Sequence, residues 1–490
     1  MKKTVTGYRL IFGYLGIFMM MVGLINFLPI IVIIFYPEDM TYINHFLLSG
    51  TVSIIMGYGL FRLIKNNEKG QLERHQDVIL IFLVWTVAIL LSSIPFLLLN
   101  DFNLTQSIFE VTSGYSTTGL TVVNVSHTPK IYLMFRSLMQ FFGGIGLVLV
   151  LTSAISDKYG MRLYNAEGHN DKLLPNLAKS ARLIISLYIT YIALGTLLYV
   201  IFNMSFFDAI NHSIAAVSTG GFSTRQASIG HYNNVGIEII TIVLMLLGST
   251  NLVIHLNLFK GRIKKIYKHI ELKLLLGLTI VLLPLMTLSI LSFYDGRWGY
   301  AIRHGIFQFV SAATTTGFQT VESFDNLPYF FLVSVIILMI IGGGIGSTAG
   351  GIKQYRIGLA LKHLIWNIRT KMSHQKTIHA HSIYKFDQYA EISAEDINQN
   401  NAHIFLYVGV LWIGVMAYSA AGYDLMASLF EFASALGTVG LSIGIIGPNI
   451  SSSILWTTTI GMFLGRLEFF VIIIALTQIG QDIFTKRAYK

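Results

Sequence analysis

Residues 109–123 read FEVTSGYSTTGLTVV, and the same pattern returns three times farther along the chain. The later copies are NHSIAAVSTGGFSTR at 211–225, FQFVSAATTTGFQTV at 307–321 and FEFASALGTVGLSIG at 430–444. Each copy contains Thr-x-Gly followed by Leu or Phe. Internal repeats of this kind indicate one architecture built from several equivalent units. The four stretches therefore decide how the rest of the sequence is divided.

Aligning the copies on their shared glycine shows which positions are constrained. The residue two before the glycine is always threonine, the residue six before is small, and the residue nine before is polar. The threonines and glycines are Thr117 and Gly119, Thr219 and Gly221, Thr315 and Gly317, and Thr438 and Gly440. The residues between them are Thr118, Gly220, Thr316 and Val439. The polar residues are Glu110, His212, Gln308 and Glu431.

Two apolar stretches flank each copy. In the first unit they are 78–99 and 131–155, with a short segment at 105–115 just before Thr-x-Gly. The other units lie at about 181–260, 271–363 and 402–481. A membrane-spanning helix needs about 20 residues, so the short segment can enter a bilayer and return but cannot cross it. Irregular backbone at that depth is tolerated only inside protein or along a water-filled path. We therefore predict re-entrant pore helices, each followed by a segment that faces a pathway.

The composition is that of a membrane protein, because 54% of the 490 residues are hydrophobic and only 12% are charged. Apolar stretches at 10–35 and 45–64 precede the first unit, and we interpret the earlier one as a retained span. The predicted fold is an all-α integral membrane protein with ten spans and four re-entrant pore helices. Its expected divisions are an N-terminal two-helix domain and four pore repeats, the third with a cytoplasmic loop. They cover 1–77, 78–180, 181–270, 271–400 and 401–490.

The formal charge of +10 reflects how the basic residues are distributed. With ten spans, loops on the N-terminal side hold 28 of the 34 Lys and Arg residues. That asymmetry follows the positive-inside rule and places both termini in the cytoplasm. We expect membrane lipid and no nucleic acid among the partners. The absence of cysteine excludes disulfides and thiolate metal sites.

The Thr-x-Gly stretches suit a dehydrated monovalent cation. A ring of main-chain carbonyls can replace the hydration shell of such an ion, and glycine reaches the backbone angles that this requires. None of the four Thr-x-Gly triplets contains Asp or Glu, which argues against a calcium-type carboxylate ring. The twelve residues of the four Thr-x-Gly stretches are hence the predicted ion-binding filter. The polar residue nine before each glycine would either hold the filter backbone or line the vestibule.

Other functions remain open at this stage. The glycines could serve helix packing in a generic transporter, and a cation-coupled symporter would bind its substrate at broken helices. The repeats run in one orientation, with two spans and a re-entrant loop each, which favours a pore. An intramembrane enzyme would need clustered catalytic residues, and the sequence has no G-x-S-x-G or comparable motif. We expect no catalytic activity.

Two further features lie in the apolar stretches that follow the third and fourth copies. Residues 342–351 read GGGIGSTAGG, and six glycines in ten residues cannot form a stable helix interior. They are Gly342, Gly343, Gly344, Gly346, Gly350 and Gly351. A phosphate-binding loop does not fit, because Ile352 separates Gly351 from Lys353. Arg466 lies inside the last apolar stretch near Glu468, where a charge is costly enough to indicate function, although an Arg–Glu pair could also only position helices.

These residues resemble the Trk/Ktr/HKT superfamily of potassium transporters. STGGFSTR at 218–225, GSTAGGIK at 346–353, GRLE at 465–468 and the two additional N-terminal spans are most similar to its bacterial TrkH branch. The resemblance implies a potassium-uptake subunit of the bacterial inner membrane, usually a homodimer, gated by a cytosolic nucleotide-binding regulatory subunit of the TrkA type. It implies no cofactor in this chain, with K⁺ as the substrate at the filter and nucleotide only on the partner.

The resemblance also implies roles for residues below the filter. It makes the glycine-rich loop at 342–351, with Lys353, an intramembrane gate, and Arg466 an electrostatic barrier beneath the filter. Glycine at the filter position of all four repeats accompanies potassium selectivity. TVGLS at 438–442 is more similar to the Ktr branch, which leaves the type of regulatory partner open. Asp101, Asp208 and Asp424 precede the short helices, and we expect them to be helix N-caps.

Overall fold

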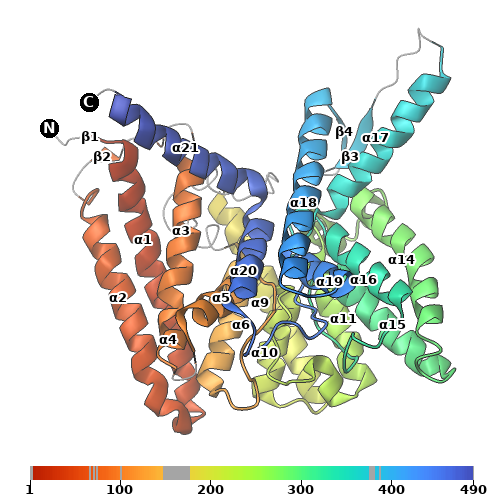
Figure 1. The fold of residues 1–490 in the computed structure, drawn as a ribbon, viewed down its shortest axis with the longest axis horizontal. Helices are drawn as coiled ribbons and strands as arrows, with labels where there is room; N and C mark the ends of the chain where they lie inside the picture. The colour runs from red at the N-terminus through yellow and green to blue at the C-terminus, as the bar shows by residue number, and fades with distance from the viewer. Residues whose placement is uncertain are drawn as a thin grey trace.

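The computed structural model describes residues 4–65, 68–69, 72, 75–99, 102–146, 177–374, 381–385 and 388–488. Helices α1 (Gly7–Phe27) and α2 (Ile43–Phe61) form an antiparallel pair at one edge of the molecule, beside α3 (Figure 1). The 3-10 turns η1 (Leu28–Ile34) and η2 (Pro37–Tyr42) join them. Gly16 and Gly57 face each other, and a Cβ on either would overlap the backbone of the opposite helix. Small residues allow this close approach in membrane helices.

The remaining chain repeats one order of elements four times, as the predicted fold requires. The first helices are α3 (Gln76–Ser92, continued by α4, Ile94–Leu97), α9 (Leu177–Ile201), α14 (Ile270–Ser289) and α18 (Ala394–Ala420). The short helices are α5 (Leu104–Tyr115), α10 (Phe206–Val217), α15 (Trp298–Ala313) and α19 (Leu425–Leu436). The second helices are α6 (Lys130–Ile145), α11 (Val235–Ser249), α16 (Tyr329–Ile341) and α20 (Ser452–Leu467). The predicted helical membrane fold of fused pore repeats is confirmed.

The second helices differ from the prediction, which placed a break only in the third unit. α11 meets α12 (Leu252–Phe259) at a bend of 117°, and α20 meets α21 (Phe469–Ala488) at 101°. α16 ends where the glycine-rich loop begins, and α17 (Gln354–Met372) follows it. α6 ends at Ile145, and most of the predicted continuation to 155 lies outside the described residues. The second helices of the second and fourth units are therefore not continuous spans.

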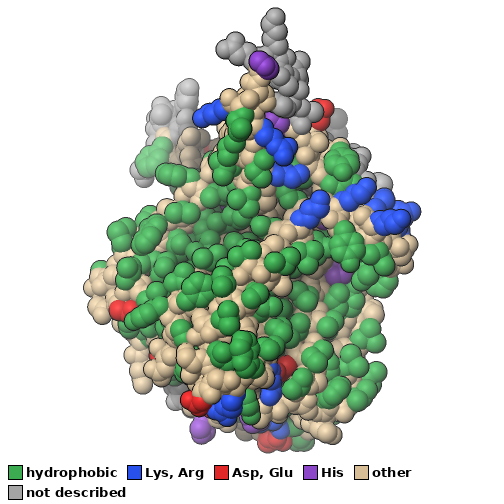
Figure 2. Space-filling model, turned by 90° about the vertical axis from the view of Figure 1, so that its right-hand side faces the viewer, with side chains coloured by type: hydrophobic (Ala, Val, Ile, Leu, Met, Phe, Trp, Pro, Cys, Tyr) green, Lys and Arg blue, Asp and Glu red, His purple; other side chains and the backbone are tan. Residues whose placement is uncertain are grey.

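Because of these breaks, fewer than ten of the described helices are long enough by themselves to cross a membrane. Within the described residues, six helices are long and apolar enough to cross a membrane, or up to eight if each bent pair is one span. The sequence patterns at α6 and α16 account for the remaining two expected spans. Figure 2 shows a lateral face that is largely hydrophobic, with many Lys and Arg side chains toward the end from which α17 projects. The chain is thus a multi-pass membrane protein.

Short elements complete the described chain. They are η3 (Ser228–Tyr232), α13 (Ile263–Ile266) and two small sheets, β1 (Thr4–Val5) with β2 (Glu68–Lys69) and β3 (Ser382–Lys385) with β4 (Gln388–Glu391). The pair β1–β2 is parallel and the pair β3–β4 is antiparallel. α21 runs back across α3 toward the N-terminus (Figure 1), where the Tyr8 hydroxyl donates to Asp482 at 2.6 Å. Both ends of the chain consequently lie at the same end of the molecule.

The starts of the short helices test the predicted N-caps. Asp424 caps α19 by accepting from the N–H groups of Met426 and Ala427, as expected. The prediction for Asp208 is wrong, because Ser205 caps α10 and accepts from the Asp208 N–H. The Asp208 carboxylate instead binds Arg225 at 2.7 Å. The prediction for Asp101 is wrong too, because Asn103 caps α5 by accepting from the Gln106 N–H at 2.9 Å, and Asp101 itself lies outside the described residues. A carboxylate inside the first turn is still favourable, since it faces the positive end of the helix dipole.

Candidate functional site

The four Thr-x-Gly segments share one unusual backbone conformation. The threonines have φ between +49° and +58°, and the glycines have φ between +69° and +92°. In every repeat the residue between them donates its N–H to the carbonyl six residues before the glycine, at 2.8 to 3.0 Å. Positive φ is a genuine outlier for a β-branched residue and persists only where the surroundings impose it. Because all four copies adopt this conformation, the direction of the backbone groups is the feature that the four repeats share.

The four segments close into a ring. Each filter glycine packs against the carbonyl oxygen of the residue before the glycine in another repeat, so that a Cβ would overlap that oxygen. Gly119 meets Gly220, Gly221 meets Thr316, Gly317 meets Val439, and Gly440 meets Thr118. The contacts run through the repeats in chain order and return to the first. This cycle arranges the four backbone segments around one pseudo-fourfold axis.

A cavity of about 430 Å³ opens on one side of the ring. All four filter glycines line it, together with residues of the segments that follow them, such as Thr121, Ser223, Gln319 and Ser442. The filter threonines are fully buried behind the glycines. Each short helix ends just before its threonine, and the carbonyl end of a helix carries partial negative charge. Four such helix ends around one axis favour a cation there.

The polar residues nine before the glycines are all fully buried, so they do not line the vestibule. Glu110 accepts from the Val122 N–H at 3.1 Å and from the Thr121 hydroxyl. Glu431 accepts from the Ser442 hydroxyl at 2.5 Å and from the Ile443 N–H at 2.9 Å. These two carboxylates hold the backbone just after the glycine. The geometry in their repeats is that of filter support.

The other two polar residues differ from the carboxylates. His212 Nε2 lies 2.8 Å from the Ser223 hydroxyl, in the segment after Gly221. The Gln308 side-chain amide has no hydrogen-bond partner among the described residues. The serines six before the glycine add support in three repeats. The hydroxyls of Ser113 and Ser434 accept from the filter glycine N–H at 3.1 and 3.0 Å, and the Ser311 hydroxyl donates to the Phe318 carbonyl at 2.6 Å. The four repeats therefore share the backbone conformation of the filter but differ in the side chains that hold it.

Sequence reasoning gave no role to Arg136. Its side chain is 1% exposed. The Nε donates to Glu110 at 2.8 Å, and the guanidinium lies 3.9 Å from the centre of the Phe222 ring. Its Nη1 donates to the Ser223 carbonyl at 3.3 Å. Arg136 joins the first repeat to the second. Its position inside the predicted span 131–155 was a signal, since a charge within a span usually has a partner.

The glycine-rich loop lies against the inner ends of the filter. The Gly350 N–H donates to the Thr315 hydroxyl at 2.7 Å, and the Thr219 hydroxyl donates to that of Thr348 at 3.0 Å. A Cβ on Gly350 would overlap the Thr438 hydroxyl oxygen and the Gly437 carbonyl. The loop thus contacts the threonine of three repeats. No room exists between the loop and the fourth repeat's segment for even one added methyl group at this point.

The other glycines of the loop shape its turns. Gly342, Gly346 and Gly351 have φ of +70°, +68° and +77°, which few other residues adopt. Gly344 donates its N–H to the Ser249 carbonyl at 2.9 Å, and the Gly343 carbonyl accepts from the Gln354 N–H at 2.8 Å. These bonds fasten the loop to the break in α11 and to the start of α17. The predicted gate residues therefore form one connected substructure.

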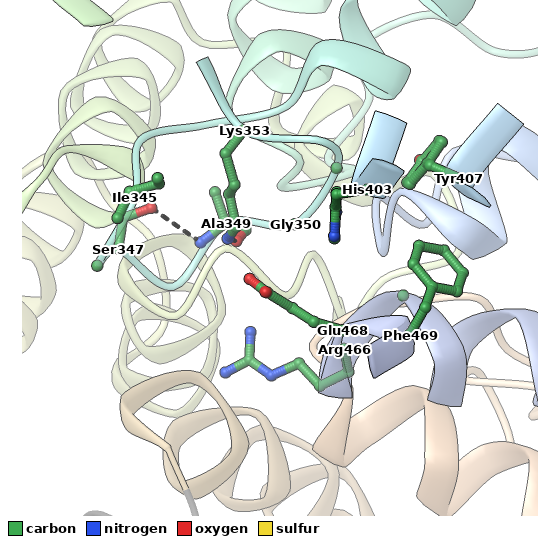
Figure 3. Close-up of a pocket in the computed structure, with 13 residues that line it drawn as sticks. Ile345, Ser347, Ala349, Gly350, Lys353, His403, Tyr407, Arg466, Glu468 and Phe469 are labelled. Carbon is green, nitrogen blue, oxygen red and sulfur yellow. Dashed lines mark hydrogen bonds between the residues drawn. The ribbon is translucent and has the colours of Figure 1, made fainter. Parts of the chain in front are cut away.

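Arg466 lies beside the loop, and Figure 3 shows its side chain with those of Lys353 and Glu468 around a small cavity. The guanidinium donates to the Thr348 carbonyl at 2.9 Å and to the carbonyls of Gly143 and Gly144 at the end of α6. Lys353 Nζ donates to the Ala349 carbonyl. Arg466 thereby links the loop to the first repeat, where the negative helix end suits a cation.

Glu468, the acidic neighbour of Arg466, has an ion-pair partner of its own among the described residues. Glu468 binds Arg356 of α17, with 2.7 Å between the carboxylate and the guanidinium. Glu468 also occupies the bend between α20 and α21 with φ of +55°. The ion pair therefore joins the bend of the fourth repeat to the helix that follows the glycine-rich loop. Arg466 itself is held by backbone carbonyls.

The chain is similar to known proteins along almost its whole length. The model of the TrkH family, described as cation transport protein, matches residues 42–487. An uncharacterized cation transporter of Methanocaldococcus jannaschii is 30% identical over 477 residues, covering 96% of this chain and 95% of the relative. The Trk system potassium uptake protein TrkH of Escherichia coli K12 is 30% identical over 426 residues, covering 84% of this chain and 86% of the relative.

A solved structure has a similar fold. The crystal structure of the potassium transporter TrkH from Vibrio parahaemolyticus matches with a TM-score of 0.84 and 26% sequence identity. The match covers 96% of this chain and 99% of that chain. This chain and that transporter therefore share the fold from the N-terminal helix pair to the fourth repeat.

Proposed function

The chain belongs to the TrkH family of cation transport proteins, and on that premise we propose that it takes up K⁺ through the ring of four Thr-x-Gly segments. The observation that carries this proposal is the closed cycle of glycine–carbonyl contacts around the axis. Backbone carbonyls in such a ring can replace the hydration shell of a monovalent cation. Two of the similar proteins are named for potassium.

The glycine-rich loop is the proposed gate. It contacts the inner ends of the filter in three repeats and would have to move before an ion could pass inward. Arg466 supports the same role in two ways. It fixes the loop through the Thr348 carbonyl, and its charge repels cations below the filter. Lys353 lies two residues after the loop and adds a second positive group beside the same cavity.

Regulation and assembly are proposed from the resemblance. α17 begins immediately after the glycine-rich loop, so a cytosolic partner that displaces α17 would pull directly on the loop. A nucleotide-binding regulatory subunit of the TrkA type would act in this way. The chain would function as a homodimer in the bacterial inner membrane, with both termini cytoplasmic. Their common location at one end of the molecule fits that orientation.

The proposed function is tested by growth of a bacterium that lacks its own potassium uptake systems. We expect the wild-type chain to restore growth at low external K⁺. Gly119→Ser should weaken the preference for K⁺ over Na⁺, because the added side chain overlaps the Gly220 carbonyl of the ring. Gly277→Ser is the matched control, since a Cβ at Gly277 meets nothing within 4 Å.

Two results would contradict the proposal. One is a wild-type chain that reaches the membrane without restoring growth. The other is a Gly119→Ser variant whose ion preference equals that of the wild type and of the Gly277→Ser control.

A further inference from the structure

The second repeat differs from the others at the middle position of its filter. Thr118 and Thr316 each bond a hydroxyl two residues earlier in their own repeat, at 2.6 and 2.8 Å. Val439 fills the equivalent position with a buried apolar side chain. Gly220 has no side chain to offer, and the nearby Ser218 hydroxyl bonds the Ile214 carbonyl instead. Support for this segment must come from elsewhere.

The missing side chain is replaced by Gln140 of α6, in the first repeat. A Cβ on Gly220 would overlap the Gln140 carboxamide, so the amide occupies the space of the absent side chain. Gln140 is fully buried. Its Nε2 donates to the Gly220 carbonyl at 2.5 Å, and its Oε1 accepts from the Phe222 N–H at 3.3 Å. One side chain therefore bonds the backbone on both sides of the filter glycine Gly221.

Within the described residues, no other repeat has this arrangement. The residues at the same distance before the end of α11, α16 and α20 are Leu244, Ile336 and Met462, which cannot form hydrogen bonds of this kind. Gln140 belongs to a face of α6 that contacts the second repeat throughout. Ser137 donates to Asn211 of α10 at 2.6 Å, and Arg136 bonds the Ser223 carbonyl. The second filter segment is thus built on a helix of its neighbour.

We propose that Gln140 is a positioning residue that holds the second filter segment in its cation-binding conformation and thereby sets the preference for K⁺ over Na⁺. The inference rests on the proposed function. A carbonyl oxygen has two lone pairs, so the Gly220 carbonyl can accept from Gln140 and still face an ion. Glycine is the residue whose backbone is freest to rotate. Without the amide, the Gly220 peptide would lose the bond that fixes its carbonyl direction.

The test compares K⁺ uptake and Na⁺ competition for Gln140→Met in cells that lack their own potassium uptake. Methionine keeps the length of the side chain and removes both hydrogen bonds. We expect the K⁺ preference to fall about fivefold or more, the change that one net hydrogen bond makes in a conformational equilibrium. The apparent KM for K⁺ should rise more than the maximal rate falls. Gln399→Leu, at an exposed glutamine of α18, is the control and should change neither quantity.

A second pair of variants tests the fit between Gln140 and Gly220. Gly220→Thr alone should abolish uptake, because its side chain overlaps the Gln140 carboxamide. Combining it with Gln140→Ala vacates that space and gives the second repeat the pattern of the first and third. We expect the double variant to recover uptake. This pair decides the matter if Gln140→Met is absent from the membrane, since a double variant as defective as Gly220→Thr would show that the Gln140 amide does not stand in for the side chain missing at Gly220.

The outcomes separate this inference from the proposed function. A wild-type chain that carries K⁺, with a Gln140→Met variant whose K⁺ preference is unchanged and whose rate falls only with its membrane abundance, would overturn the role of Gln140 alone. A wild-type chain that carries no K⁺ would overturn the proposed function and this inference together.

Discussion

At each filter threonine the backbone adopts a left-handed conformation that a β-branched residue ordinarily avoids. Hydrogen bonds from the same repeat impose this conformation, and the glycine two residues later lets the neighbouring carbonyl approach. The sequence could predict the threonines and glycines, because four aligned copies reveal shared positions. It could not predict that Arg136 and Gln140 serve the second repeat, because those contacts join residues about 80 positions apart in the chain.

Gly317 offers the sharpest test of the close packing in the ring. Gly317→Ala would place a methyl group against the Val439 carbonyl at a φ of +83°. We expect K⁺ uptake to fall by about tenfold or more, since left-handed backbone alone costs about 1–2 kcal/mol for alanine. Gly277→Ala in α14 is the matched control and should leave uptake unchanged. Normal uptake by Gly317→Ala would show that the ring is looser than these contacts require.

We expect the buried Arg136–Glu110 ion pair to stabilise the folded protein. Both side chains are buried, so Arg136→Ala leaves an unpaired carboxylate inside the protein. Breaking a buried pair in this way costs about 3–5 kcal/mol, which should lower the Tm of the purified protein in detergent by several degrees. The double variant Arg136→Met/Glu110→Gln should recover much of that loss, because no charge then remains buried.

An exposed pair is the control for that measurement. Arg297 and Asp295 lie 3.4 Å apart with side chains that are 60% and 84% exposed. Such a pair contributes little, so Arg297→Ala should leave the Tm unchanged. Equal melting of Arg136→Ala and Arg297→Ala would mean that Glu110 does not depend on its arginine.

Among the helices, the main feature is the break that follows α11, α16 and α20. The break after α16 could be predicted, because six glycines follow it. The bends after α11 and α20 could not, since Ser249, Thr250, Leu467 and Glu468 are not helix breakers. Tertiary contacts impose them instead. The Ser249 carbonyl accepts from Gly344 of the glycine-rich loop, and Glu468 is held by Arg356. The glycine-rich loop holds the bend after α11, and α17, which follows that loop, holds the bend after α20.

Arg466 tests how these elements hold the pathway closed. Arg466→Gln removes the charge and most of the donors that bind Thr348, Gly143 and Gly144. We expect higher basal Rb⁺ flux into proteoliposomes that contain the purified chain. Arg466→Lys separates the two roles, because it keeps the charge but cannot span three carbonyls. If Arg466→Lys has a flux near that of the wild type, the positive charge is what bars ions. If its flux is raised, the hydrogen bonds of Arg466 to the three carbonyls hold the pathway closed.

The control for Arg466 is Arg297→Gln, which removes an exposed charge far along the chain from the glycine-rich loop. Its basal flux should equal that of the wild type. If Arg466→Gln reaches the membrane and its flux also equals that of the wild type, Arg466 neither bars ions nor holds the loop.

At the scale of the whole molecule, the four repeats are equal in backbone and unequal in everything that surrounds it. Carboxylates support the filter in the first and fourth repeats, and a histidine and Gln140 support it in the second. In the third, Ser311 bonds the Phe318 carbonyl and Gln308 has no hydrogen-bond partner among the described residues. The repeated order of helices could be predicted because hydrophobicity and length determine it. The different supporting side chains of the repeats could not be predicted, because they depend on which residues the folded chain brings together.

The central claim is that the four Thr-x-Gly segments form one site for a monovalent cation. Crystals grown in Rb⁺, measured at the rubidium absorption edge, test it most directly. We expect anomalous density on the axis of the ring, among the carbonyls of Thr118, Gly220, Thr316 and Val439, and its loss when Na⁺ replaces Rb⁺. Well-ordered crystals with Rb⁺ bound elsewhere and no density on that axis would contradict the account.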